Sequence, residues 1–228
     1  MKALVLLSGG VDSSTCLAWA KESCEDVLAL TMAYGQKHRR ELEAAQAVAA
    51  YYNVRLLHMD LAEIFAHSDC SLLRHSSASV PHASYAEQLK ERPGEAVSTY
   101  VPFRNGLFLA AAASIALEYG CEVIFYGPHA DDAAGSAYPD CSREFNAAMN
   151  EAVYLGTGKK VRLLAPFVNK TKKDIVAEGL RLGVPYELTW SCYDGGDEPC
   201  HCCGTCIDRE AAFVANGVTD PLLRKEHE

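Results

Sequence analysis

The chain has 228 residues, of which 49% are hydrophobic, and its 30 acidic and 21 basic residues give a formal net charge of −9. This length suits one large α/β domain with an appendage, and the composition allows a substantial core. The acidic balance argues against a broad surface for nucleic acid or anionic lipid, because such surfaces need clustered Lys and Arg. The sequence contains no apolar run long enough to cross a bilayer and no signal-peptide cleavage pattern. We therefore expect a cytoplasmic protein that binds a small molecule and has no direct nucleic-acid or membrane partner.

Residues 8–14 form a glycine-rich loop between an apolar run at 2–7 and a helical pattern at 13–22. In the sequence Ser-Gly-Gly-Val-Asp-Ser-Ser, the glycines let the backbone approach a phosphate, and the N–H groups of the helix start would face it. Asp12 would repel a bare phosphate, so we interpret it as a magnesium ligand or a helix-capping carboxylate. Neither G-x-x-x-x-G-K-[ST] nor the dinucleotide pattern G-x-G-x-x-G occurs in the sequence. The structural alternative is an ordinary glycine turn capped by Asp or Ser.

Apolar runs alternate with helical patterns through most of the chain. Buried strands are predicted at residues 2–7, 27–32, 54–59, 122–126 and 161–164. Helices are predicted at residues 13–22, 38–52, 106–119, 175–182 and 208–215, and a further helix is expected to end near residue 154. This alternation implies right-handed crossovers and a five-stranded parallel sheet with helices on both faces. Ligands of such sheets bind at the carboxyl ends of the strands, where the glycine-rich loop lies.

Residues 61–99 lack this periodicity and are rich in polar and turn-forming residues. Because compact domains rarely carry long idle loops, we expect this insertion to be a mobile lid over the ligand site or a disordered segment. Its histidines, His67, His75 and His82, have no metal-ligand spacing, so we expect them to be solvated or to face a substrate.

Three further groups of polar residues lie at predicted strand ends or helix starts. Arg104 and Asn105 precede the helix at 106–119, and the alternative for Asn105 is a simple helix cap. Asp131 and Asp132 follow the fourth strand and suit magnesium, the polar edge of a ring, or a solvated turn. Lys172 lies in a capping-box pattern and can reach a phosphate, although its position alone favours a surface lysine.

Five of the ten cysteines cluster near the C-terminus. Cys192, Cys200, Cys203 and Cys206 can supply the four thiolates of a tetrahedral zinc site, since clustered thiols in a reducing compartment more often hold a metal than form disulfides. Two-residue spacers favour Cys203 over Cys202 as the third ligand. An iron–sulfur centre uses the same ligands and stays open. With all four positions filled by protein, we expect one zinc per chain with a folding role.

Together these motifs resemble the 7-cyano-7-deazaguanine synthase family of the ATP-pyrophosphatase superfamily. The resemblance covers nearly the whole chain in the family's order. It rests on the loop at 8–14, Tyr34-Gly35-Gln36 with His38, Val101-Pro102 with Arg104-Asn105, Tyr138-Pro139-Asp140-Cys141 with Glu144-Phe145, Thr171-Lys172 with Ile175, and Thr189-Trp190-Ser191-Cys192-Tyr193 followed by the cysteines.

The resemblance implies a Rossmann-like fold of the adenine nucleotide alpha-hydrolase type at residues 1–185, with the lid-like insertion at 61–99, and a small helical zinc-binding region at 186–228. It implies an ATP-dependent carbon–nitrogen ligase of queuosine biosynthesis, commonly a homodimer. Such an enzyme converts 7-carboxy-7-deazaguanine and ammonia to 7-cyano-7-deazaguanine through adenylated intermediates. ATP, zinc and magnesium are the implied cofactors.

The resemblance also implies roles for individual residues. ATP is assigned to Leu7, Ser8, Gly9, Gly10, Val11, Asp12, Ser13, Ser14 and Thr15. Ser8, Asp12 and Lys172 are the implied catalytic residues, with Asp12 on magnesium and Lys172 on the phosphates. The substrate pocket is expected to include Tyr34, Gln36, Arg104, Asn105, Tyr138 and Asp140.

The chain departs from the family pattern at three places. Phe103 stands where the family usually has Gly, Ser142-Arg143 replaces Arg-Pro, and the segment 131–137 is longer. These departures lie on the presumed substrate side and leave open a paralogue that acts on a different acid. A tRNA-modifying thiolase or lysidine-type ligase shares the phosphate loop but needs a basic tRNA-binding surface. A non-catalytic, zinc-stabilised binding module is a further alternative, against which the intact Ser8 and Asp12 argue.

Overall fold

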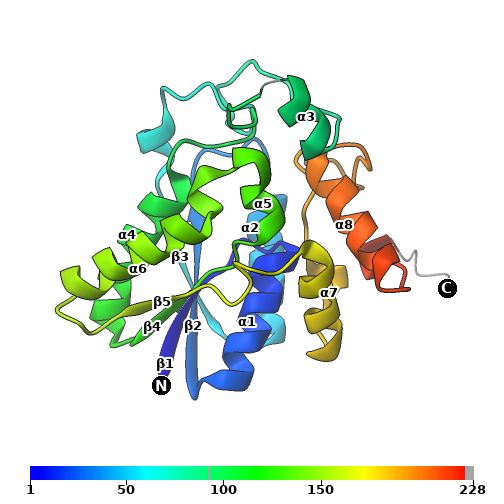
Figure 1. Cartoon of the computed structure of the whole chain (residues 1–228). Coiled ribbons are helices and arrows are strands. Elements are labelled where there is room, and N and C mark those ends of the chain that lie inside the picture. The colour runs from blue at the N-terminus through cyan, green and yellow to red at the C-terminus, as the bar shows by residue number, and fades with distance from the viewer. Residues whose placement is uncertain (92, 224–228) are drawn as a thin grey trace.

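A five-stranded parallel sheet forms the centre of the protein (Figure 1). The computed structural model describes residues 1–91 and 93–223. The strands are β1 (Lys2–Leu6), β2 (Asp26–Ala33), β3 (Arg55–Asp60), β4 (Val123–Phe125) and β5 (Arg162–Leu164), in the spatial order β3-β2-β1-β4-β5. Every neighbouring pair is parallel. The predicted Rossmann-like α/β sheet is confirmed, and the direction of its strand order changes between β1 and β4.

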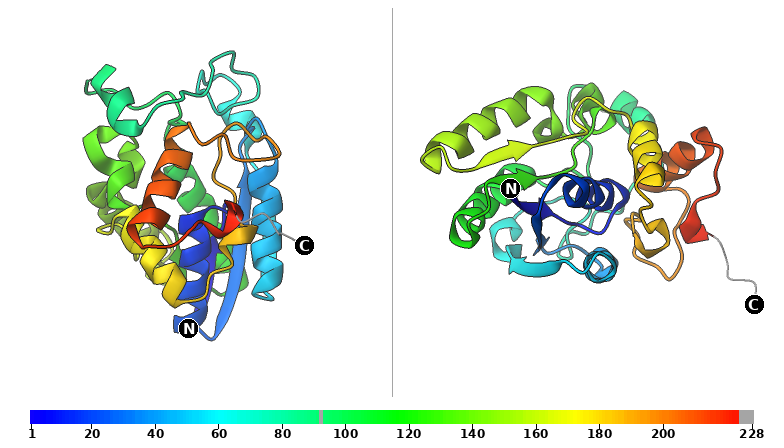
Figure 2. Two further views of the ribbon diagram at one scale, coloured as in Figure 1. Left: turned by 90° about the vertical axis from the view of Figure 1, so that its right-hand side faces the viewer. Right: turned by 90° about the horizontal axis from the view of Figure 1, so that it is seen from below.

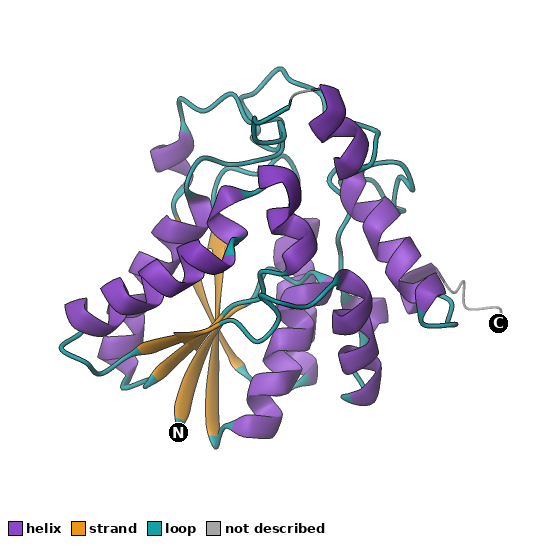
Figure 3. Ribbon diagram, viewed as in Figure 1, coloured by secondary structure: helices purple, strands orange, loops and turns teal. Residues whose placement is uncertain are grey.

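Helices cover both faces of the sheet (Figures 2 and 3). One face carries α1 (Val11–Ser23) and α2 (Arg40–Tyr51), with α7 (Lys172–Arg181) packed beside α1, and the other carries α4 (Arg104–Tyr119) and α6 (Arg143–Gly156). Successive strand residues point to opposite layers, so that Val5 packs with the first layer and Leu4 with the second. Because both faces are covered, the strands are continuous apolar runs in the sequence.

The starts of α7 and α4 show how local sequence sets the helix ends. In α7, the hydroxyl of Thr171 accepts a hydrogen bond from the N–H of Asp174, and the Asp174 carboxylate accepts one from the N–H of Thr171. The predicted capping box is therefore confirmed. In α4, the capping position is Phe103, which has a φ of 55° and no side-chain cap, and Arg104 and Asn105 are the first helical residues. The interpretation of Asn105 as a simple cap is therefore wrong.

The insertion at 61–99 contains more regular structure than its composition indicates. It includes the helix α3 (Tyr85–Glu91), which its irregular polar pattern does not predict. Leu72 and Leu73 are buried in an apolar cluster with Tyr34, which lies just after β2. The insertion runs above the carboxyl ends of the strands, at the top of Figure 1. These apolar anchors place it over the edge of the sheet where ligands of such folds bind.

The remaining elements are short, apart from the C-terminal helix α8 (Gly204–Ala215). They are α5 (Ala130–Ala133) and the 3₁₀ turns Ala62–Phe65, Ala134–Ser136, Pro139–Cys141, Tyr186–Leu188 and Pro221–Leu223. None of the helices in the described part of the chain is long and apolar enough to cross a membrane.

A buried ion pair anchors the C-terminal region. The side chains of Arg209 in α8 and Asp220 are each 3% exposed, and Nε of Arg209 lies 2.5 Å from Oδ2 of Asp220. The guanidinium also donates hydrogen bonds to Oδ1 of Asp220 at 2.9 Å, to the hydroxyl of Thr189 at 2.9 Å and to the carbonyl of Tyr186 at 3.1 Å. The hydroxyl of Tyr186 in turn lies 2.8 Å from that of Thr15 in α1. These contacts connect α8 to the helix that follows the glycine-rich loop.

We expect Asp220→Ala to lower the free energy of unfolding by about 3–5 kcal/mol, because it leaves the Arg209 guanidinium buried without its carboxylate. Urea unfolding followed by circular dichroism measures this change. The control is Glu22→Ala, which breaks a pair between two half-exposed side chains, Glu22 and Arg181, and should change stability little. Equal losses in the two variants would contradict an anchoring role for Asp220.

Candidate active site and metal centre

Close backbone contacts hold the loop between β1 and α1. Gly9 has a φ of +85°, and a Cβ atom at this position would overlap the backbone nitrogen of Ala45 in α2. Glycine is required here both by its backbone conformation and by the lack of space. The carbonyl of Gly9 accepts a hydrogen bond of 2.9 Å from the N–H of Trp190. The loop is thus fixed by α2 and by a segment from the far end of the chain.

The N-terminal end of α1 is not capped by a side chain. Its capping residue is Gly10, and no side-chain hydrogen bond closes the helix start. The hydroxyls of Ser8 and Ser13 lie 3.0 Å apart next to this end. In an ordinary capped turn, a side-chain oxygen accepts a hydrogen bond from one of the first helical N–H groups. The start of α1 has no such bond. The geometry therefore favours an anion site at a helix N-terminus.

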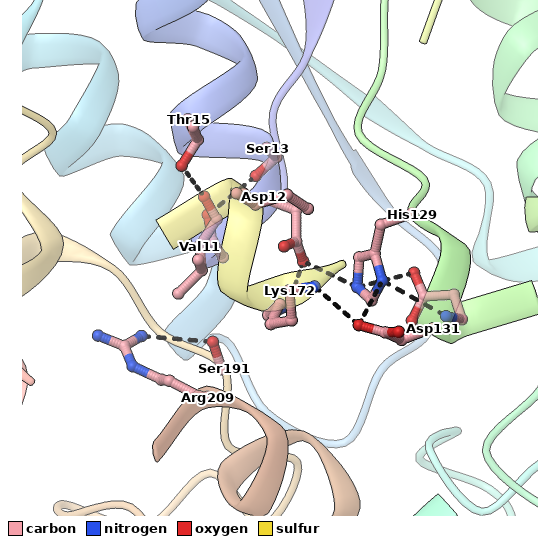
Figure 4. Close-up of polar contacts among 12 residues, drawn as sticks. Val11, Asp12, Ser13, Thr15, His129, Asp131, Lys172, Ser191 and Arg209 are labelled. Carbon is pink, nitrogen blue, oxygen red and sulfur yellow. Dashed lines mark hydrogen bonds and ion pairs between the residues drawn. The ribbon is translucent and has the colours of Figure 1, made fainter. Parts of the chain in front are cut away.

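Charged side chains from three segments meet beside this loop (Figure 4). Nζ of Lys172, in the first turn of α7, lies 2.5 Å from Oδ2 of Asp12. Nε2 of His129 lies 3.9 Å from the same oxygen and 3.3 Å from Oδ2 of Asp132. Lys172 is only 9% exposed, so its interpretation as a surface lysine is wrong. The structure brings together the cation and carboxylates that the sequence could place only at separate strand ends.

The charges in this group shift one another's pKa values. Burial raises the pKa of Asp12, but the Lys172 ammonium and His129 outweigh burial and hold that pKa below its usual value. Burial lowers the pKa of Lys172, and Asp12 and Asp132 more than compensate, so it is raised. Burial raises the pKa of Asp132. The Asp12–Lys172 pair is therefore charged at neutral pH, and its contribution to stability is lost as the pH falls through the lowered pKa of Asp12.

The carboxylate of Asp12 also fits a magnesium ion. Its Oδ1 is buried and has no hydrogen-bond partner among the described residues. A buried oxygen without a partner costs free energy unless a ligand meets it. Magnesium is commonly bound by one or two carboxylates together with substrate phosphates, and Asp132 is the second carboxylate beside this position. The residues present thus fit a magnesium-bound nucleotide.

A cavity of about 220 Å³ joins this charged group to the residues predicted to bind substrate. The predicted residues on its wall come from the loop, from α7 and from the carboxyl-end edge of the sheet. They are Leu7, Ser8, Gly10, Val11, Asp12, Ser13, Tyr34, Gln36, Arg104, Asn105, Tyr138 and Lys172. Residues expected to bind ATP and residues expected to bind substrate thus line the same cavity.

Four of the residues predicted to bind ATP or substrate are not on the cavity wall. Gly9 packs against α2, as described above. Ser14 is fully buried, and Thr15 bonds to Tyr186. Oδ2 of Asp140 accepts a hydrogen bond of 2.9 Å from the backbone N–H of Asn105. Asp140 therefore stabilises the start of α4.

Arg104 provides a positive charge among aromatic rings in the same cavity. Its guanidinium carbon lies 4.9 Å from the centre of the Tyr34 ring and 5.8 Å from that of Phe108. Glu41 also lines the cavity, and burial raises the pKa of its carboxyl group. The charge of Arg104 interacts with Glu41 and Asp140, but Arg104 takes part in none of the ion pairs found among the described residues. Such a cation is available for the carboxylate of a ligand.

Sequence reasoning missed several residues of the cavity wall. They include Glu41, Tyr85, Tyr126, His129 and Tyr193. His129 had a recognisable signal, because it directly follows the end of the fourth strand and precedes the Asp pair. Tyr85 had none, since it comes from the insertion, and only the folded chain places it at the site.

The predicted metal ligands lie together near the start of α8. The four sulfur atoms are within 4.8 Å of one another, and they belong to Cys192, Cys200, Cys203 and Cys206. Three of these cysteines are buried and Cys200 is partly exposed. A closed set of four thiolates is the donor set of a structural zinc site. Cys202 lies outside this set and forms a second group with His82 and Cys200, which the sequence spacing did not indicate.

A comparison with protein families finds a match over nearly the whole chain. The family model described as queuosine biosynthesis protein QueC matches residues 2–217. The chain belongs to the QueC family. The QueC match spans the phosphate loop, the insertion and the cysteine cluster, and it confirms the resemblance that the motifs indicated.

Relatives in this family share most of the chain's length. One from Archaeoglobus fulgidus, named 7-cyano-7-deazaguanine synthase, is 48% identical over 227 residues, which cover 99% of this chain and 91% of the relative. A relative of the same name from Caldicellulosiruptor bescii is 40% identical, with coverage of 97% and 96%. A third, from Thermoplasma acidophilum, is 43% identical, with coverage of 97% and 91%.

We expect one zinc ion per chain at the four clustered thiolates. Cys200→Ser should lose the metal and the folded C-terminal region, because the binding free energy of a structural metal is folding free energy. Elemental analysis of the purified variants measures zinc content. Cys202→Ser is the matched control, with the same atomic change two residues away, and should keep its zinc. Full occupancy in Cys200→Ser, or loss in Cys202→Ser, would contradict this ligand set.

Proposed function

We propose that this QueC-family chain is a 7-cyano-7-deazaguanine synthase, an ATP-dependent ligase that uses 7-carboxy-7-deazaguanine, ammonia and ATP. The observation that carries the proposal is one cavity, which joins an uncapped phosphate loop and the partly buried Asp12–Lys172 pair to the Arg104 guanidinium. The near full-length similarity to relatives of that name supports it. These features fit an enzyme that adenylates a carboxylic acid.

In this proposal the triphosphate lies across the start of α1. The helix N-terminus and the hydroxyls of Ser8 and Ser13 bind its phosphate oxygens, and the ammonium of Lys172 offsets charge on the leaving group. Asp12 and Asp132 would hold magnesium, which supplies further charge neutralisation at the phosphates. Binding the β- and γ-phosphates as one unit leaves the α-phosphorus open to attack.

The acid binds next to the α-phosphate, with its carboxylate directed by Arg104. A carboxylate oxygen attacks the α-phosphorus, pyrophosphate leaves, and an acyl-adenylate forms. Ammonia then attacks the acyl carbon, loses a proton and displaces AMP to give the amide. The amide oxygen attacks a second ATP in the same way, and loss of AMP and the remaining N–H protons gives the nitrile. Positioning and charge stabilisation supply most of the catalysis.

A planar heteroaromatic acid suits the wall around Arg104. Tyr34 and Phe108 present ring faces near the guanidinium, and such faces stack with flat ligands while the cation pairs with a carboxylate. Asn105 adds an amide on the same wall. The pocket therefore combines an apolar surface for a ring with a charge for its acid group.

Two of the three departures from the family pattern, Phe103 and Ser142-Arg143, do not favour a different acid. The third, the segment 131–137, contains Asp132, which lies on the cavity wall. Phe103 is 57% exposed, and its ring packs against that of Phe145 at 5.8 Å. The hydroxyl of Ser142 accepts a hydrogen bond of 3.1 Å from the N–H of Phe145 and so caps α6. Neither Phe103 nor Ser142 lies on the cavity wall. Both substitutions have local structural roles outside the pocket.

We also propose the wider organisation that the resemblance implies. Residues 1–185 would form the nucleotide-binding domain, residues 186–228 the zinc-binding region, and two chains a homodimer. Two contacts with the first part of the chain support a C-terminal region that completes the site. The N–H of Trp190 donates to the carbonyl of Gly9, and the hydroxyl of Tyr186 bonds to that of Thr15. The alternatives of a tRNA-modifying enzyme and of a non-catalytic module are less well supported, because the relatives are synthases and the site is intact.

We expect AMP and pyrophosphate as the products of ATP, with no ADP. With ¹⁸O in the acceptor carboxylate, one label should pass to AMP in the first half-reaction, as mass spectrometry would detect. Asp12→Asn should slow product formation by about 10²-fold or more, because it removes charge from the phosphate site.

Asp26→Asn is the control for this variant. It makes the same substitution at an exposed carboxylate paired with Lys2, and it should leave the rate unchanged. Label in orthophosphate together with ADP would contradict adenylation, and equal rates for the two variants would contradict the role of Asp12.

We expect the insertion at 61–99 to act as a lid that excludes water from the acyl-adenylate. Tyr85, from this insertion, already lies on the cavity wall, so bound ligands should protect the segment. Amide hydrogen exchange in residues 61–91 should slow when ATP and the acid are both present, and residues 143–156 of α6 serve as the internal reference. Unchanged exchange in the insertion with both ligands bound would contradict a lid.

A further inference from the structure

Three tyrosine hydroxyls from distant segments meet on the cavity wall. The hydroxyl of Tyr85 in α3 lies 3.1 Å from that of Tyr193, and the hydroxyl of Tyr138 lies 3.3 Å from Tyr85 and 3.4 Å from Tyr193. The hydroxyl of Thr99 anchors Tyr138 at 2.6 Å. All three tyrosines line the same cavity as Ser8 and Arg104.

A tyrosine hydroxyl is uncharged at neutral pH. Burial raises the pKa of Tyr138 to about 12 and raises that of Tyr85 well above its ordinary value. A neutral phenol can donate one hydrogen bond and accept others, and its O–H rotates to suit the partner. A ring of three such groups can therefore face a ligand edge that carries both donors and acceptors.

We propose that Tyr85, Tyr138 and Tyr193 recognise the polar edge of the heterocyclic acid and distinguish it from acids that lack such an edge. The lactam and amino groups of a deazapurine present alternating donors and acceptors, which the three hydroxyls can match by rotation. This inference rests on the proposed function and assigns substrate recognition to two residues, Tyr85 and Tyr193, outside the predicted pocket.

The cysteine loop positions two of the three hydroxyls. Tyr193 directly follows the metal-ligand candidate Cys192 in the chain. Gly204, the first residue of α8, follows Cys203 and lies under the ring of Tyr85, where an added Cβ would be 2.9 Å from Cε1 of that ring. The C-terminal region therefore determines the positions of Tyr85 and Tyr193. Its role includes the recognition of substrate in addition to folding.

The test compares phenylalanine variants, which remove one hydroxyl each and keep the ring. Tyr85→Phe and Tyr193→Phe should each raise KM for 7-carboxy-7-deazaguanine by about 3- to 10-fold and leave KM for ATP unchanged. Tyr51→Phe is the matched control, because Tyr51 is 58% exposed on α2, and it should change neither value. Gly204→Ala, which presses on the Tyr85 ring, should raise KM for the acid while zinc content and KM for ATP stay the same.

A binding measurement separates failure of this inference from failure of the proposed function. Calorimetry with 7-carboxy-7-deazaguanine and α,β-methylene-ATP gives the affinity of each variant without turnover. Weaker binding of the acid in Tyr85→Phe and Tyr193→Phe, but not in Tyr51→Phe, supports the inference. If the wild type binds the acid and both variants bind it equally well, the inference alone is overturned. If the wild type does not bind the acid, the proposed function is overturned as well.

Discussion

The close approach of Gly9 to α2 is the constraint on which the site depends. At this residue the glycine-rich loop lies against the backbone of Ala45 and accepts a hydrogen bond from Trp190, so three parts of the chain meet where there is no side chain. Any larger residue would push the loop away from α2. The start of α1 would move with it, and Asp12, which stands in the first turn, would lose its alignment with Lys172.

The ion pairs Arg209–Asp220 and Asp12–Lys172 have different surroundings. Around Arg209 and Asp220 the polar groups of the guanidinium and the carboxylate find partners in the protein, as expected of a pair that only holds structure together. Around Asp12 one carboxylate oxygen has no partner among the described residues. A buried polar atom without a partner can mark a place that a ligand completes. Asp12 is one of six side chains in the described part of the chain with such an atom, and it also lies on the cavity wall, paired with Lys172. The contrast is the physical reason to place the chemistry at Asp12.

Local patterns predicted the strands of the sheet, the glycine-rich turn before α1 and the grouping of the cysteines, because each depends on residues close together in the sequence. The burial of Lys172 could not be predicted, since its partner Asp12 is 160 residues away. The contact between Tyr85 and Tyr193, which are 108 residues apart, could not be predicted for the same reason. At the start of α4, the interpretation of Asn105 as the helix cap failed for two reasons. Phe103, a non-glycine residue in the left-handed conformation, occupies the capping position, and Asp140, which is distant in sequence, accepts the hydrogen bond from the N–H of Asn105.

The separation of Asp12 and Lys172 has a consequence for how the site arises during synthesis. The loop emerges from the ribosome well before its lysine, which follows Asp12 by 160 residues, and before Trp190 and the cysteines. A nascent chain can form the first strands and helices, yet its glycine-rich loop still lacks Lys172 and the hydrogen bond from Trp190. Contacts between residues so distant in sequence form slowly and late in folding. A nascent chain that stops before these residues therefore lacks a complete site, and ligand binding becomes possible only after they have been synthesised.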